Sequence, residues 1–347
     1  MRSYSIMLIG EAWGAEEAAL GMPFVGAAGR ELNRMLTEAG IERRECYATN
    51  VFNLRPDNND LKNLCTDKRG STVPLPELSR GQYLQDQYYS EVQRLWDEVS
   101  RVQPNLVIAL GNTALWALTG SYGIKKLRGT VTAATFGTCA GIKVLPTYHP
   151  AAVLRDWSAR PVVIADFMKA KRQALFPEVR RPKRELWLEP TINHIELFYR
   201  TYVAVGCTKL AFDIETAGAS QITCVGFSPS PERALVIPFV DNRQPSGSYW
   251  SDPGLEAAAW EWVGRFLSHE ENPGIELVGQ NTLYDINWLW HKVGLVPKSY
   301  TRDTMLKHHA INPELEKSLG FLGSVYTDEP AWKTMRGKGL FTIKRGE

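Results

Sequence analysis

The sequence predicts an α/β protein built from two domains. Its 347 residues suit two domains better than one. Before about residue 176, apolar runs alternate with helical patterns, which is typical of a mainly parallel sheet covered by helices. Residues 176–190 are rich in proline, Arg and Lys, a composition that favours neither a helix nor a strand. We therefore expect one domain over residues 1–177, a basic linker over 178–190 and a second domain over 191–347.

Strands and helices are expected to alternate through the first domain. The expected strands are Ser5–Ile9, Tyr47–Phe52, Leu106–Leu110 and Ile142–Leu145. The expected helices are Leu32–Ala39, Val92–Val102, Ala114–Leu118 and Val162–Leu175. Such sheets bind ligands at the carboxyl ends of their strands, and polar or glycine-bearing groups follow all four strands here. These groups are Gly10–Gly14, Asn50 with Asn53 and Arg55, Gly111 with Asn112, and His149 with Pro150. We expect them to converge on one rim.

In the second domain, the apolar run Lys209–Glu215 is expected to form a strand that carries two acids. Asp213 and Glu215 are two residues apart, so their side chains project from the same face of a strand. Neighbouring carboxylates in an apolar setting repel each other and are costly to desolvate, and a divalent cation removes both penalties. Oxygen ligands suit Mg²⁺ or Mn²⁺. The alternative is a strand end with two solvated acids.

A third acid follows an expected junction between a strand and a helix. Tyr284, Trp288 and His291 recur at spacings of four and three, which predicts a helix. Asn281 is expected near the helix start, where its side chain caps the helix. Asp285 lies one turn further on, within reach of a metal held by the first two acids. An acid on a helix face is otherwise expected to be solvated.

The overall composition restricts the class of protein only weakly. The net charge is +2, so global charge does not require a nucleic acid partner. The basic linker is the strongest local cluster, and it suits either a phosphate backbone or solvent. Five cysteines show no paired spacing and are expected as reduced thiols in the cytoplasm. No signal peptide and no run of eighteen apolar residues is present, so no membrane partner is expected.

Several segments of the first domain together resemble the uracil-DNA glycosylase superfamily, nearest to its family 4 type. These segments are Gly10–Glu17, Gly21–Gly29, Thr49–Val51, Ala109–Asn112 and Pro146–Arg155. The resemblance covers roughly residues 4–176. It implies a three-layer α/β/α fold and DNA as the partner, with a base flipped out of the duplex and held by stacking and edge hydrogen bonds.

The resemblance also implies roles for individual side chains. Phe24 stacks on the pyrimidine, and Asn50 reads the base edge, since an amide offers both a donor and an acceptor. His149 donates a hydrogen bond to the negative charge that develops on a uracil oxygen. Glu11, or Glu17 in its place, positions water or stabilises the cationic sugar.

Further substrate contacts and two departures complete this resemblance. Three glycines are expected to let the backbone approach phosphate closely, and they are Gly10, Gly14 and Gly26. Arg55 is a further substrate-binding candidate on the rim. Trp13 stands where the family has proline, so it fills the pocket or alters the choice of base. No iron–sulfur cluster is expected, because Cys65 alone is a candidate for one of the four cysteines of family 4.

From about residue 186 the chain resembles the 3′–5′ proofreading exonucleases with four catalytic carboxylates, the ribonuclease-H-like domain attached to family A DNA polymerases. The segments that carry this resemblance are Phe212–Thr216, Asn281–Asp285, Asp303–His309, Lys317–Leu322 and Tyr326–Pro330. It implies a mixed sheet and hydrolysis with two Mg²⁺ or Mn²⁺ ions. By this resemblance, Asp213 bridges both metals, Glu215 binds one and orients water, and Asp285 completes one coordination shell. Asn281 is a substrate-binding candidate.

The fourth carboxylate of that family is not found. It follows a Tyr or His by four residues, and here Pro330 follows Tyr326 and Thr304 follows Tyr300 at that spacing. The second domain is therefore expected to be C-terminally incomplete. Three interpretations stay open: a truncated gene product, a site completed by a second polypeptide, or a domain kept for binding alone.

The favoured function is a DNA replication or repair protein in which a 3′–5′ exonuclease-like domain is fused to a glycosylase-like DNA-binding domain. It is expected to be associated with a phage replicative polymerase, with a separate polymerase polypeptide as a partner, in the cytoplasm of a bacterium or phage-infected host. One alternative is a catalytically inactive DNA-binding or polymerase-accessory module. The other is a uracil-excising DNA glycosylase.

Overall fold

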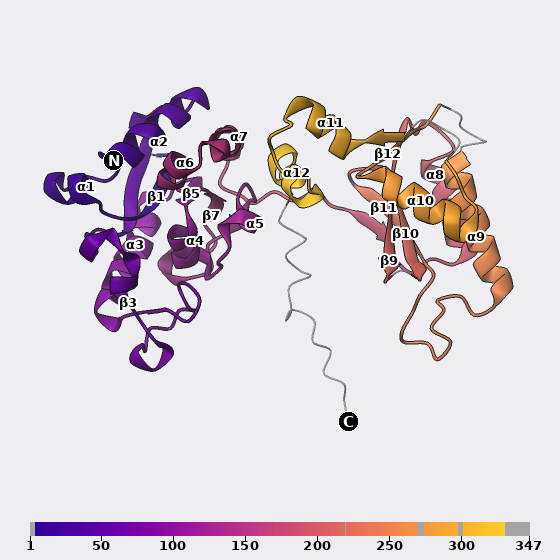
Figure 1. Ribbon diagram of the computed structural model, residues 1–347, viewed down its shortest axis with the longest axis horizontal. Helices are drawn as coiled ribbons and strands as arrows, with labels where there is room; N and C mark the ends of the chain where they lie inside the picture. Colours follow the sequence, from indigo (N-terminus) through magenta and orange to yellow (C-terminus); the bar gives the residue numbers. More distant parts are fainter. Residues whose placement is uncertain (1–3, 219, 269–273, 298–300, 330–347) are drawn as a thin grey trace. The chain divides into compact units, whose positions relative to one another are not determined.

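The computed structural model describes residues 4–218, 220–268, 274–297 and 301–329 (Figure 1). The chain forms two compact units. The first runs to Arg180 and also takes in the described residues from Gly320 onward, whereas the second comprises Arg181–Leu319. In this division the segment after Leu319, which was predicted to belong to the second domain, groups with the first unit.

A five-stranded sheet lies at the centre of the first unit, in the order β2-β1-β5-β7-β6. Four of its strands are parallel, and the short β6 pairs antiparallel with β7. The strands are β1 (Ile6–Ala12), β2 (Cys46–Phe52), β5 (Leu106–Leu110), β6 (Thr132–Ala133) and β7 (Lys143–Thr147). The four predicted strands and their parallel arrangement are therefore confirmed.

Helices cover both faces of this sheet (Figure 1). They are α1 (Ala15–Leu20), α2 (Ala27–Glu38), α3 (Tyr89–Val102), α4 (Asn112–Thr119), α5 (Ile124–Leu127), α6 (Pro150–Arg155) and α7 (Arg160–Gln173). Met7 of β1 lies in one core with Trp96 of α3. Its neighbour Leu8 lies in the other core with Leu32 of α2. Because both faces of β1 are buried, the strand reads as a continuous apolar run. The predicted three-layer α/β/α architecture is confirmed.

The second unit contains a mixed sheet of six strands, in the order β13-β12-β9-β10-β11-β8. The central strands β9, β10 and β11 are antiparallel, and the other three join by parallel pairing. The strands are β8 (Glu185–Trp187), β9 (Lys209–Ala217), β10 (Gln221–Ser230), β11 (Arg233–Pro238), β12 (Glu276–Gly279) and β13 (Thr301–Asp303). The predicted mixed sheet is confirmed. The predicted linker over 178–190 contains β8, because its apolar residues pair with the edge of the sheet.

Within the described residues of the second unit, four helices follow or separate these strands. They are α8 (Ile192–Tyr202), α9 (Pro253–Ser268), α10 (Thr282–Val293) and α11 (Thr304–Ile311). Phe212 and Ile214 of β9 are buried in a core to which α8 and α9 contribute. Asp213 and Glu215 alternate with them and lie on the exposed side of the strand. The two acids thus share one face, as their spacing predicts.

Two further elements belong with the first unit. A two-stranded ribbon pairs β3 (Cys65–Thr66) with β4 (Tyr83–Leu84). The helix α12 (Leu319–Tyr326) lies almost wholly in the segment that groups with the first unit. Across the described ranges, no helix is both long and apolar enough to cross a membrane.

Candidate functional site

Three predicted site residues of the first unit meet where β1 and β2 run side by side. Gly10 of β1 lies opposite Asn50 of β2 in the parallel register. A Cβ atom on Gly10 would lie 2.2 Å from Asn50 Oδ1 and 2.6 Å from Phe24 Cζ, so only glycine lets the amide and the ring come together. Phe24 has a φ of 61°, an uncommon conformation for an aromatic residue that the surrounding structure must maintain.

His149 lies beside this group, between β7 and α6. Its Nδ1 accepts a hydrogen bond of 3.2 Å from the backbone N–H of Ala151, so Nδ1 carries no proton. Burial lowers the pKa of His149, and the charge of Glu11 opposes that shift only in part. The neutral ring therefore keeps its proton on Nε2. The ring centroids of His149 and Phe24 are 6.4 Å apart, so a neutral hydrogen-bond donor neighbours the aromatic ring.

Glu11 is held in place by a residue that the sequence analysis did not name. Thr113 at the start of α4 donates a hydrogen bond of 2.5 Å from Oγ1 to Glu11 Oε2. A Cβ atom on Gly111 would lie 3.1 Å from His149 Cβ, so this helix start also touches the histidine. Thr113 immediately follows Gly111 and Asn112 on the predicted rim, and this position in the sequence could have indicated that it belongs to the site.

Other predicted residues of the first unit have different surroundings. Glu17 Oε1 accepts a hydrogen bond of 2.9 Å from the N–H of Gly26. A Cβ atom on Gly14 would lie 2.7 Å from Glu17 Oε2. The carboxylate of Glu17 thus occupies the space beside both glycines, where the sequence analysis expected phosphate. Arg55 is exposed, and its Nε donates a hydrogen bond of 2.8 Å to Asn59 Oδ1.

Trp13 follows β1 directly and is half-buried. Its backbone N–H donates a hydrogen bond of 3.1 Å to the carbonyl of Leu54, which continues the contact between β1 and the chain after β2. Its indole Nε1 is buried and has no hydrogen-bond partner within the described part of the chain.

In the second unit, the structure brings Asp285 to the strand that carries Asp213 and Glu215. Asp285 lies on the buried side of α10 and is only 3% exposed. Burial and then the charge of Asp213 raise its pKa from 3.8 to about 7, against an opposing backbone hydrogen bond from Ile214. Because Ile214 lies between the two strand acids, the Asp285 carboxyl is packed against that segment of β9.

These acids fit a divalent cation only in part. Over the ranges that the structure describes, no three His, Cys, Asp or Glu side chains are grouped so as to hold a metal ion. The Asp213 and Asp285 carboxyls nevertheless offer hard oxygen donors, and their mutual repulsion is what a cation would relieve. They are the two residues that would hold such an ion, with Glu215 on the same exposed side of the strand.

Asp303 organises the backbone around the third acid. Asn281 occupies the N-cap position of α10 with a φ of 57°, but its side chain does not cap the helix, contrary to the prediction. Asp303 instead accepts hydrogen bonds of 3.1 and 2.8 Å from the N–H groups of Asn281 and Thr282. It also accepts from the N–H groups of Met305 and Leu306 at the start of α11. Burial alone raises the pKa of Asp303, but these amides together lower it.

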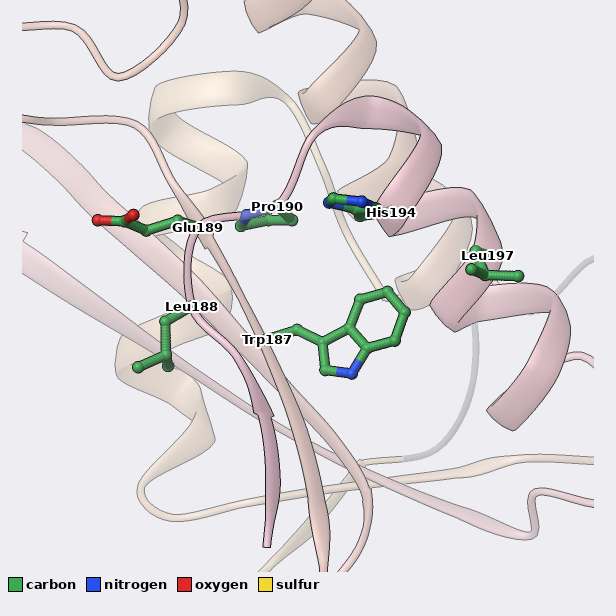
Figure 2. Close-up of a pocket in the computed structure, with 6 residues that line it drawn as sticks. All are labelled: Trp187, Leu188, Glu189, Pro190, His194 and Leu197. Atoms are coloured by element: carbon green, nitrogen blue, oxygen red, sulfur yellow. The ribbon is translucent and has the colours of Figure 1, made fainter.

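Among the cavities of the second unit, two have the same volume. One of about 340 Å³ opens beside Asp213 on the sheet and is lined by residues of β9 to β12. Figure 2 shows the other, also about 340 Å³, where Trp187 lies beside His194 and Leu197 of α8. The cavity beside Trp187 is lined by none of the predicted site residues. The cavity on the sheet has Asp213 in its lining.

Phe24, Asn50 and the neutral His149 thus meet in an α/β protein at the carboxyl end of its parallel strands, the end at which such sheets bind ligands. The family model described as "Uracil DNA glycosylase superfamily" matches residues 3–179. The chain therefore belongs to the uracil DNA glycosylase superfamily, which confirms the first resemblance.

Individual relatives agree with this assignment. The type-4 uracil-DNA glycosylase of Thermotoga maritima is 34% identical over 170 residues, which cover 48% of this chain and 76% of that protein. The type-4 enzyme of Archaeoglobus fulgidus is 32% identical over 174 residues, 47% of this chain and 74% of that protein. These matches concern the first half of the chain only.

One relative is similar to this chain over residues of both units. A DNA polymerase of Bacillus phage SP01 is 22% identical over 305 residues, 82% of this chain and 30% of the polymerase. Because 305 residues exceed either unit, the second resemblance, to polymerase-attached exonucleases, is confirmed as a likeness. Among solved structures, Brucella melitensis NrnC bound to pGG matches with a TM-score of 0.30 and 15% identity, over 43% of this chain and 63% of that one. Family membership and the polymerase likeness identify a protein of DNA repair or replication.

Proposed function

We propose that the first unit removes uracil from DNA. The observation that carries this proposal is the meeting of Phe24, Asn50 and His149 around Gly10 in a member of the uracil DNA glycosylase superfamily. A base flipped out of DNA stacks on Phe24 and pairs its edge with the Asn50 amide. The type-4 relatives carry the name uracil-DNA glycosylase, which supports uracil as the base.

The surroundings of the site favour cleavage of the bond between base and sugar. The neutral His149 ring donates from Nε2 to the uracil oxygen on which negative charge develops as the bond breaks. Glu11, fixed by Thr113, accepts a proton from the water that adds to the sugar carbon, or stabilises the positive charge there. The displaced base leaves with the bonding electron pair. No metal takes part in this reaction.

The test uses the full chain with uracil-containing DNA in the presence of a chelator. We expect abasic sites to accumulate, and Asn50→Ala to lower their rate on the order of 100-fold, because an amide that pairs the base edge is lost. Asn63→Ala is the matched control, since Asn63 is exposed and its side-chain amide donates to the nearby carbonyl of Asp57. No abasic sites from the unmodified chain, or undiminished activity of Asn50→Ala, would contradict the proposal.

A second function is favoured by the buried Asp285 beside Asp213. We propose that the second unit hydrolyses nucleotides from DNA 3′ ends with Mg²⁺ or Mn²⁺, in association with a DNA polymerase. The repulsion from Asp213 that helps to raise the pKa of Asp285 to about 7 supports a carboxyl pair whose ionised form a cation would stabilise. When bound, the cation polarises the phosphate and activates water. Asp213 and Asp285 would hold the cation.

For this second function, a 5′-labelled single strand is incubated with the full chain and Mg²⁺ or Mn²⁺. We expect stepwise shortening, and Asp213→Ala should slow it on the order of 100-fold, since a proposed metal ligand is removed. Asp252→Ala is the control, because Asp252 is an exposed acid that bonds to the start of α9. Equal shortening by both variants would exclude the proposed site. No shortening by the parent chain, even with added polymerase, would exclude the function.

A further inference from the structure

Two cationic side chains of the first unit are buried under the segment that returns from the second unit. Arg128 and Lys169 are each 1% exposed, as is Asp166. Buried charges are tolerated only when they are paired and fully hydrogen-bonded. The hydrogen-bond partners of these two cations therefore identify the segments of the chain that allow the first unit to bury them.

Arg128 connects the returning segment with a buried carboxylate. Its Nε donates a hydrogen bond of 2.9 Å to Asp166 Oδ2, and its Nη2 forms an ion pair with the same carboxylate. Its Nη1 donates a hydrogen bond of 2.8 Å to Ser324 Oγ of α12. The guanidinium also lies 5.4 Å from the centre of the Phe321 ring. The helix α12 thus supplies the acceptor for the Arg128 nitrogen that does not bind Asp166.

Lys169 relies on the same segment. Its ammonium donates hydrogen bonds to the carbonyl oxygens of Gly129, Ser324 and Thr327, at 2.8 Å to Gly129 and 2.6 Å to Thr327. Two of these three acceptors belong to the returning segment. Burial lowers the pKa of Lys169 to about 8, so the ammonium is held by these carbonyls against a desolvation penalty.

The buried carboxylate leads from α12 to the candidate base-binding site. Asp166 Oδ2 accepts a hydrogen bond of 2.6 Å from Thr147 Oγ1, and Thr147 is the last residue of β7. The carbonyl of Thr147 accepts a hydrogen bond of 2.8 Å from the N–H of Gly111. A Cβ atom added to Gly111 would lie 3.1 Å from His149 Cβ, so this glycine neighbours the histidine. His149 itself follows Thr147 by two residues. A continuous chain of contacts therefore runs from Ser324 to the histidine.

We propose that residues 320–327 are a positioning element of the glycosylase-like site: through Ser324, Arg128 and Asp166 they hold the end of β7 and thereby the ring of His149. This inference rests on the proposed function of the first unit for its catalytic consequence, but not for its structural one. Loss of the Ser324 hydroxyl leaves Arg128 with an unsatisfied buried donor, which loosens its hold on Asp166 and on Thr147.

The test compares Ser324→Ala with Ser268→Ala in the full chain. Both serines donate from Oγ to the carbonyl three residues earlier in a helix, but only Ser324 accepts from a buried cation. Hydrogen exchange is measured at the backbone N–H groups of residues 149–153, apart from Pro150, which has none. We expect about tenfold faster exchange there in Ser324→Ala and no change in Ser268→Ala. Ser324→Thr, which keeps the hydroxyl, should restore slow exchange.

Excision kinetics give a second readout that a merely structural role would not move. We expect kcat of Ser324→Ala to fall about tenfold with KM little changed, because His149 acts on charge that develops in the transition state. Unchanged exchange at residues 149–153 in Ser324→Ala overturns the inference, whatever the kinetics. If the unmodified chain excises no uracil, the proposed function fails, and the exchange measurement still decides whether α12 holds β7.

Discussion

Asp285 differs from Asp213 and Glu215 in its surroundings, although all three are carboxylates. The strand acids lie on the exposed side of β9, whereas Asp285 is buried on α10. A buried carboxyl close to another acid resists ionisation, so its pKa rises to about 7. The native state consequently binds a proton at Asp285 over a pH range in which the unfolded chain does not.

This difference predicts how stability depends on pH. The stabilising contribution of protonated Asp285 is fully present below pH 3.8 and is lost as the pH rises from 3.8 to about 7. Asp285→Asn removes the ionisation, so we expect it to raise the unfolding midpoint of the second unit at pH 8 by about 4 °C or more, with little change at pH 3.5. Calorimetry at both pH values checks this. The exposed Asp252→Asn serves as control, and an equal gain at both pH values would contradict the expectation.

At the scale of elements, the ends of helices do much of the positioning. The start of α4 supplies Thr113 to Glu11, and the start of α6 fixes the tautomer of His149. In the second unit, Asp303 binds four N–H groups from the starts of α10 and α11. A single carboxylate thus fixes two helices, one of which carries Asp285.

We expect Asp303→Ala to destabilise the second unit by about 2 kcal/mol, because the N-terminal N–H groups of two helices lose their acceptor. Asp252→Ala removes an acid that caps only α9 and should cost about 1 kcal/mol. Urea unfolding followed by tryptophan fluorescence measures both. If the two variants are equally stable, Asp303 does not join the two helices in the way that its hydrogen bonds indicate.

At the scale of the whole chain, each unit holds its own candidate site. Gly10, Asn50 and His149 all belong to the first unit, and Asp213 and Asp285 belong to the second. The first site uses no metal in our proposal, while the second depends on one. The two proposed activities therefore have different requirements within one polypeptide.

We expect the activities to be separable. Asn50→Ala should lower uracil excision on the order of 100-fold and leave 3′ shortening within about twofold, and Asp213→Ala should do the reverse, because sites without shared partners act additively. A chelator should reproduce the effect of Asp213→Ala alone. Parallel assays on one DNA that contains uracil and a free 3′ end measure both products. Loss of both activities in either single variant would show that the sites are coupled.

Much of the fold could be predicted because periodicity is a local property. The buried run of β1 and the alternation of β9 each identify a strand and its faces without any knowledge of neighbours. The rim at Gly10, Asn50 and His149 could also be predicted, since parallel strands end at one edge. The capping role of Asn281 was predicted wrongly: its side chain makes no capping hydrogen bond, and the acid that binds this helix start, Asp303, lies 22 residues further along the chain.

The amino-acid sequence by itself determined the two sheets, the family of the first unit and the identity of the three acids, because each depends on residue type and spacing along the chain. Only the tertiary structure decided that Asp285 is buried beside Asp213, that Thr113 holds Glu11, and that Ser324 completes the partners of Arg128. The last contact joins residues 196 positions apart. Burial and hydrogen bonding between distant segments are set by how the elements pack, and no local pattern records them.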